Sequence, residues 1–270
     1  LSSFPFNRIS IGIQTFNDTL LHFLNRRHTA AQAVAAVDNC RRAGFDNISI
    51  DLMYGLPGET LKDLICDLSY AVSLHVEHIS AYHLTYEEGT PIYNMLQKHR
   101  IKEVDEENSL RFFAVLTGRL SEAGYEQYEI SNFCRPGKHS SHNTAYWEGI
   151  AYMGCGLSAH SYNGHSREWN TSSLDDYIKG MEDDRRMYET EELDQVTRYN
   201  ECIITSIRTR RGLSLKQVEA DFGKDYLVDC LQIAQKYLNS GHLEVSGDYL
   251  RLTQEGIFVS DGIMSDLLRI

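Results

Sequence analysis

Short apolar runs alternate with apolar positions at helical spacing along the first part of the chain. The runs predict strands at residues 8–14, 47–54 and 78–84, and the spacings predict helices at 30–43 and 60–73. A strand–helix–strand series of this kind forms a parallel sheet with right-handed crossovers. A sheet that begins at Ile9 would leave a long apolar edge open, which folded proteins avoid. We therefore expect an α/β segment that is the later part of a longer protein.

The pattern changes character after this segment. It predicts one long helix at 105–123 and then a half-buried strand at 125–130. An irregular stretch at 132–169, rich in Gly, His and aromatic residues, follows the strand. Helices dominate after that, at 193–208, 213–218, 226–239 and from Thr253, with two short strands at 241–245 and 249–252. Helix, turn, helix and a pair of strands predict a winged-helix-like unit. We therefore expect an α/β segment, an irregular linker segment and a helical C-terminal domain, at 1–130, 131–175 and 176–270.

Composition narrows the class of protein. The formal net charge is -12 and the pI is about 5.4, which argues against a general nucleic-acid or anionic-membrane surface. Residues 190–270 hold 9 Lys/Arg and 13 Asp/Glu, so a DNA-binding role for the winged-helix-like unit is disfavoured. The six cysteines are scattered and no two are closer than 21 residues, which indicates reduced thiols in a cytoplasmic protein. No apolar run approaches the ~18 residues that a membrane span needs.

An acid interrupts the second apolar run. Asp51 lies between Ile50 and Leu52, and the run ends at the Gly55–Pro57–Gly58 turn. A buried carboxylate needs a partner, because an unpaired one is expensive. One interpretation is a core acid bonded to backbone amides, and the other is a ligand-binding acid at the mouth of a parallel sheet. The residue pattern leaves both interpretations open.

A histidine, an amide and two large aromatic residues occupy six successive positions of the irregular stretch, from His142 to Trp147. An imidazole beside aromatic rings suits axial ligation of the iron of a flat macrocycle. The same residues could instead form a hydrogen-bonded core corner. His139 and His160 are competing candidates for a ligand, so the pattern alone does not choose.

Several stretches together resemble one family. They appear in the order 8–16, 25–28, 50–60, 125–132 and 142–147. The combination is similar to radical S-adenosylmethionine (SAM) proteins related to oxygen-independent coproporphyrinogen III oxidase. The His-Asn-x-x-Tyr-Trp segment resembles the HemW-type branch, whose members are regarded as haem chaperones. The resemblance implies the later half of a radical SAM (β/α)6 partial barrel, then a mainly helical C-terminal domain with a winged-helix-like part.

The resemblance also implies the site residues. Gln14, Arg26, Asp51 and Thr85 match polar residues that line the SAM site, and His142 becomes the candidate haem ligand. No residue is assigned a catalytic role. The family's Cys-x-x-x-Cys-x-x-Cys motif for the [4Fe-4S] cluster is absent here, so we expect those ligands upstream and no metal ligand in this chain. SAM and the cluster are then cofactors of the full-length protein, together with haem.

Two functions follow from the resemblance. The preferred one is a haem-binding chaperone that delivers haem to apo-proteins. The alternative is an enzyme, an oxygen-independent coproporphyrinogen III dehydrogenase of porphyrin biosynthesis. The expected partners are haem and apo-haem proteins, with no nucleic acid and with peripheral membrane contact only through the recipients.

Overall fold

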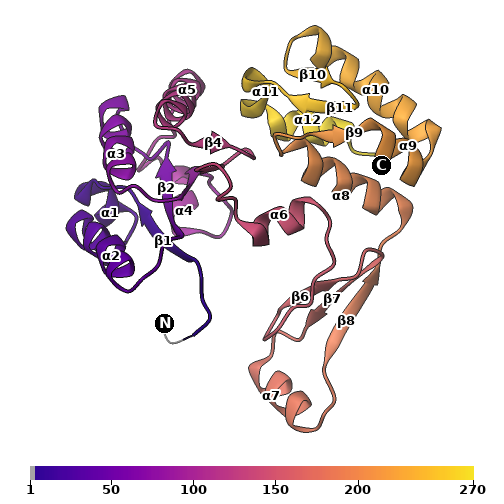
Figure 1. The fold of residues 1–270 in the computed structure, drawn as a ribbon, viewed down its shortest axis with the longest axis horizontal. Coiled ribbons are helices and arrows are strands. Elements are labelled where there is room, and N and C mark those ends of the chain that lie inside the picture. Colours follow the sequence, from indigo (N-terminus) through magenta and orange to yellow (C-terminus); the bar gives the residue numbers. More distant parts are fainter. Residues whose placement is uncertain (1–3) are drawn as a thin grey trace. The chain divides into compact units, whose positions relative to one another are not determined.

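The computed structural model describes residues 4–270 (Figure 1). Its internal contacts divide the chain into two compact units, Leu1–His139 and Ser140–Ile270. The boundaries that the sequence suggested at residues 130 and 175 stay a prediction. No helix in the described part of the chain combines the length and the apolar character that a membrane crossing requires.

A five-stranded sheet organises the first unit, in the strand order β1-β2-β3-β5-β4. Its strands are β1 (Ile9–Gln14), β2 (Ile48–Tyr54), β3 (His78–His83), β4 (Glu126–Gln127) and β5 (Asn132–Cys134). The pairs β1–β2 and β2–β3 are parallel, which confirms the prediction made from the spacing of the apolar runs. β5 is antiparallel to β3 and to β4.

The strand predicted over residues 125–130 is wrong in extent. Only Glu126 and Gln127 form β4, and the chain then turns back into β5. Glu129 stabilises this turn, because its carboxylate accepts hydrogen bonds from the Ser131 backbone amide at 2.8 Å and from Asn132 Nδ2 at 2.6 Å. A side chain that bonds its own local backbone competes with strand pairing, and the alternating pattern does not reveal this.

Five helices lie in the described part of the same unit, residues 4–139. They are α1 (Asp18–Phe23), α2 (Ala30–Arg42), α3 (Leu61–Ser73), α4 (Pro91–Gln97) and α5 (Glu106–Glu122). Capping boxes at Thr29 and Thr60 start α2 and α3, two of the helices predicted from the sequence. Of the apolar residues of α5, Phe112, Phe113, Leu116 and Leu120 are buried, whereas Leu110 is exposed.

The second unit begins with a small antiparallel sheet where the sequence predicts an irregular stretch. Its strands are β6 (His160–Tyr162), β7 (Ser166–Asn170) and β8 (Tyr188–Glu192), in that spatial order. Two short helices, α6 (Ser141–Trp147) and α7 (Leu174–Glu182), precede β6 and separate β7 from β8. The low apolar content of β8, whose five residues are all exposed, explains why the pattern does not predict it.

The rest of the second unit is mainly helical, as predicted. It comprises α8 (Gln195–Ile207), β9 (Leu213–Ser214), α9 (Leu215–Phe222), α10 (Lys224–Asn239), β10 (Leu243–Ser246), β11 (Tyr249–Leu252), α11 (Gln254–Phe258) and α12 (Ser260–Leu267). The strands pair antiparallel in the order β10-β11-β9. The single helix expected from Thr253 is two helices, separated at Val259. Its winged-helix-like character stays a prediction.

Candidate functional site

One face of the five-stranded sheet is polar. Gly12 of β1 pairs with Asp51 of β2, and Asp51 pairs with Ser80 of β3. Paired residues of neighbouring strands point to the same face, and alternate residues along a strand return to it. We call this the polar sheet face; its members are Ser10, Gly12, Gln14, Ser49, Asp51, His78, Ser80 and Asn132. The isoleucines and leucines between them occupy the opposite face, where they are mostly buried.

The side chains of Gln14 and Asp51 both lie near Gly12. A β carbon at Gly12 would lie 2.7 Å from Gln14 Nε2 and 4.0 Å from Asp51 Oδ2, so a larger residue at this position would displace the end of the Gln14 side chain. The strand register shifts between Gly12 and Gln14, and Gln14 has a φ of 72°. A left-handed backbone is uncommon for a residue other than glycine, and it aims the Gln14 amide at this spot.

The Asp51 carboxylate is half-buried and bonded to hydroxyls rather than to backbone amides. It accepts a hydrogen bond from Ser10 Oγ at 3.3 Å and another from the Ser80 side chain. Burial raises the pKa of Asp51, and these hydrogen bonds together with the positive charge of Arg8 oppose that rise. Asp51 lies in the middle of β2, not at its carboxyl end, so it does not occupy the strand-mouth position of the ligand-binding interpretation.

The other two candidates for the SAM site do not interact directly with the first two among the described residues. Arg26 follows α1 and Thr85 follows β3 by two residues, and both are exposed. Neither side chain forms a hydrogen bond with Gln14 or Asp51 among the described residues. The structure therefore brings together two of the four predicted residues through Gly12.

A hydrogen-bonded chain continues the polar face toward the start of β3. Ser49 Oγ lies 2.8 Å from His78 Nδ1, and His78 Nε2 lies 2.8 Å from the Tyr128 hydroxyl. Burial lowers the pKa of His78 to about 3, with the positive charges of Arg8 and His139 acting in the same direction. His78 is therefore a neutral hydrogen-bonding group. Sequence reasoning missed these residues, although the alternation of polar and apolar side chains in β1, β2 and β3 carries the signal.

His142 lies on α6, whose N-cap is Ser140. Its exposed imidazole packs edge-on against Tyr146, with ring centroids 4.9 Å apart at 88°, and Tyr146 packs against Tyr152 at 4.7 Å. No hydrogen bond to the His142 ring is present among the described residues. Trp147 takes a different direction, because its ring lies under the guanidinium of Arg208 at 4.1 Å. Of Tyr146 and Trp147, only Tyr146 therefore packs its ring against His142.

The two competing histidines are packed differently. His160 of β6 is tilted against Trp169, with ring centroids 5.8 Å apart. His139 belongs to the first unit and contacts Tyr128 edge-on at 5.0 Å. The residues described by the structure contain no cluster of three or more His, Cys, Asp or Glu able to hold a metal ion. They do not supply three thiolates for an iron–sulfur cluster either, since the six free cysteines form no such group.

Two family profiles match parts of the chain. The profile of the Radical SAM superfamily matches residues 1–69, and that of the HemN C-terminal domain matches residues 193–259. Both the polar sheet face up to Asp51 and the Gly55–Gly58 turn fall within the first match.

Several curated proteins and a solved structure match over nearly the whole chain. The chain is 32% identical to the haem chaperone HemW of Bacillus subtilis, with 97% of this chain and 69% of that protein covered. It is also 32% identical to the haem chaperone HemW of Mycobacterium tuberculosis, with 97% and 66% covered. The structure of coproporphyrinogen III oxidase (HemN) from Escherichia coli superposes with a TM-score of 0.76 at 21% identity, over 97% of this chain and 64% of that one. The chain spans about two thirds of the length of these relatives, and the last comparison shows a shared fold.

Proposed function

The chain belongs to the HemW-type radical SAM family, and we propose on that premise that it binds haem and delivers it to apo-proteins. The observation that carries the proposal is His142, an exposed imidazole without a hydrogen-bond partner in the described part of the chain. A neutral imidazole nitrogen is a common axial ligand of haem iron. The relatives named as haem chaperones support this use of the residue.

The surroundings of His142 suit the remainder of a haem molecule. The Tyr146 ring fixes the orientation of the imidazole from one side and leaves the other side open. Ile150 and Met153 follow in the chain and are 51% and 78% exposed, so they offer apolar surface that a porphyrin face would cover. Haem binding would be favoured by the free energy of burying apolar area of both the porphyrin and the protein.

The polar sheet face is the proposed site for SAM. Asp51 presents a carboxylate for an ammonium or a hydroxyl group, and Gln14 presents an amide that both donates and accepts. Arg26 and Thr85 join this proposal through the family resemblance. Bound SAM would supply reductive radical chemistry together with a [4Fe-4S] cluster. The described residues do not fit that cluster, so the proposal for this chain is limited to holding and orienting SAM.

Haemin titration tests the haem site. We expect His142→Ala to weaken haemin binding at least tenfold and to shift or abolish the Soret band, with an unchanged far-UV circular dichroism spectrum. His165→Ala is the matched control, because His165 is also exposed in the same unit and its imidazole forms no hydrogen bond among the described residues. Loss of binding in His160→Ala with normal binding in His142→Ala would place the ligand on β6 and contradict the assignment.

The enzyme alternative has a separate test. A version of the chain extended to the length of the relatives is incubated anaerobically with coproporphyrinogen III and SAM. We expect no protoporphyrinogen, and its formation would overturn the chaperone proposal. Apo-haem proteins as recipients, membrane contact through those recipients and a cytoplasmic location remain parts of the same proposal.

A further inference from the structure

Helix α7 exposes its apolar face. Leu174, Ile178 and Met181 are 59%, 48% and 55% exposed, although they lie at the i, i+4 and i+7 positions that normally face a core. At about 100° per residue these three side chains fall within a sector of about 60°. Apolar residues at this spacing are usually buried, so the helix has an apolar stripe without a partner.

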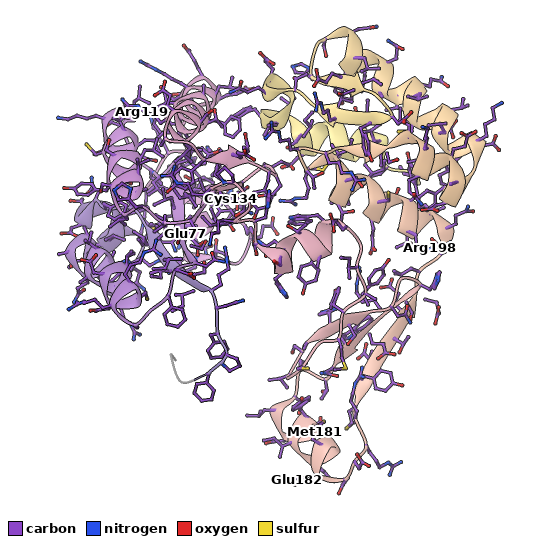
Figure 2. All side chains as sticks on the ribbon, viewed as in Figure 1. Glu77, Arg119, Cys134, Met181, Glu182 and Arg198 are labelled. Carbon is purple, nitrogen blue, oxygen red and sulfur yellow. The ribbon has the colours of Figure 1, made fainter. Side chains whose placement is uncertain are left out.

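The segment after α7 packs on another face of the helix. A β carbon at Gly180 would lie 3.3 Å from Met187 Cγ, and Gly180 lies about 100° from Met181 around the helix. The contact with Met187 therefore leaves the stripe uncovered. We define the α7 patch as the three stripe residues: Leu174, Ile178 and Met181. Figure 2 shows Met181 next to Glu182 at the end of α7.

Acidic residues form a rim along one side of the patch. Residues 174–192 contain eight Asp/Glu and three Lys/Arg, a difference of -5. Glu182 and Asp175 lie about 40° to 60° beyond Ile178 around the helix, beside the apolar stripe. One of the three basic residues is already paired, because Arg186 Nη2 lies 2.5 Å from Glu168 Oε2. The patch is therefore apolar at its centre and negatively charged at its rim.

We propose that the α7 patch binds an amphipathic, positively charged segment of a partner protein. Apolar helical anchors at i, i+4 and i+7 are a recurring way of recognising an amphipathic helix, and methionines adapt to different apolar surfaces. The rim determines the sign of the partner's charge, since complementary charges steer association and like charges oppose it. A second copy of this chain carries the same acidic rim, and an anionic membrane is repelled by it. The proposal is independent of the haem site.

A designed peptide tests the surface. The probe is a fluorescein-labelled Leu/Lys amphipathic helix of about 18 residues, a length sufficient for several helical turns, followed by fluorescence anisotropy. We expect the Ile178→Ser/Met181→Ser variant to lose at least tenfold in affinity, since both side chains are exposed and the fold does not depend on them. Val228→Ser/Val245→Ser is the control, because Val228 and Val245 are equally exposed in the same unit but lie outside the patch. This control should bind as the parent does.

Two further measurements test the charge and the occupant. A Leu/Glu peptide of the same pattern should bind at least tenfold more weakly than the Leu/Lys peptide, and equal binding would overturn the proposal. Sedimentation should show the parent chain as a monomer. Self-association that disappears in Ile178→Ser/Met181→Ser would mean that a second copy covers the patch, which would also overturn it. The proposal would also be overturned if a version extended to the relatives' length failed to bind the peptide while the present chain bound it.

Discussion

Glu59 is a buried carboxyl group between β2 and α3, and its ionisation should weaken the first unit. Its Oε2 accepts a hydrogen bond from the Leu56 backbone amide at 2.9 Å, whereas its Oε1 is buried without a hydrogen-bond partner. Burial raises the pKa of Glu59 from 4.5 to about 7, and the negative charges of Asp67 and Asp63 act in the same direction. The structure therefore favours the protonated acid.

The sign of the pH effect follows from this raised pKa. Between pH 4.5 and about pH 7 the unfolded chain releases the Glu59 proton while the folded chain retains it. The free energy of unfolding then decreases as the pH rises through this interval, and the loss is complete above the folded pKa. Each pKa unit corresponds to about 1.4 kcal/mol, so the shift amounts to about 3 kcal/mol.

The perturbation is Glu59→Gln, which keeps an acceptor for the Leu56 amide and removes the titration. Between about pH 4 and about pH 8, the free energy of unfolding of the parent should decrease by about 3 kcal/mol more than that of the variant. Comparing the two proteins removes the contributions of buried groups that do not interact with Glu59. One of them is His78, whose low pKa weakens the fold as the pH falls.

Urea unfolding followed by far-UV circular dichroism measures this difference. Tryptophan fluorescence is unsuitable, because Trp147 and Trp169 both belong to the second unit. Hydrogen exchange of the peptides covering β2 and α3 assigns the change to the correct unit. Glu87→Gln is the control, since Glu87 is exposed and its side chain makes no hydrogen bond among the described residues. Equal pH dependence in the parent and in Glu59→Gln would refute the reasoning.

Two further pairs of substitutions have defined outcomes. A β carbon at Gly256 would lie 1.9 Å from the His242 carbonyl oxygen, so Gly256→Ala should cost about 1–3 kcal/mol of stability in thermal unfolding followed by tryptophan fluorescence. Gly262→Ala, where a β carbon would meet no atom within 4 Å beyond its chain neighbours and the backbone of its own helix, should instead gain up to about 1 kcal/mol. Equal effects of the two substitutions would contradict the steric argument. In a version extended to the relatives' length, Asp51→Asn should weaken SAM binding at least tenfold in calorimetry, whereas the exposed control Asp46→Asn should not. Unchanged affinity in Asp51→Asn would remove Asp51 from the site.

Local signals in the sequence were sufficient for the elements of the first sheet and the main helices. The threonine caps at Thr29 and Thr60 and the apolar runs of β1, β2 and β3 act within a few residues, so a pattern shows them directly. The helical character of α8 and α10 was likewise predicted. The family was also determined by the sequence, because its motifs are contiguous and the relatives confirm them.

The tertiary structure decided the features that depend on contacts between distant residues. The sequence does not show that the Gln14 amide and the Asp51 carboxylate both lie near Gly12, where the register between β1 and β2 shifts. The exposure of α7 was also unpredictable, because its apolar spacing is the same as that of a buried helix. Periodicity tells which side chains share a face, and only the packing of the other elements determines whether that face meets a core, a ligand or solvent.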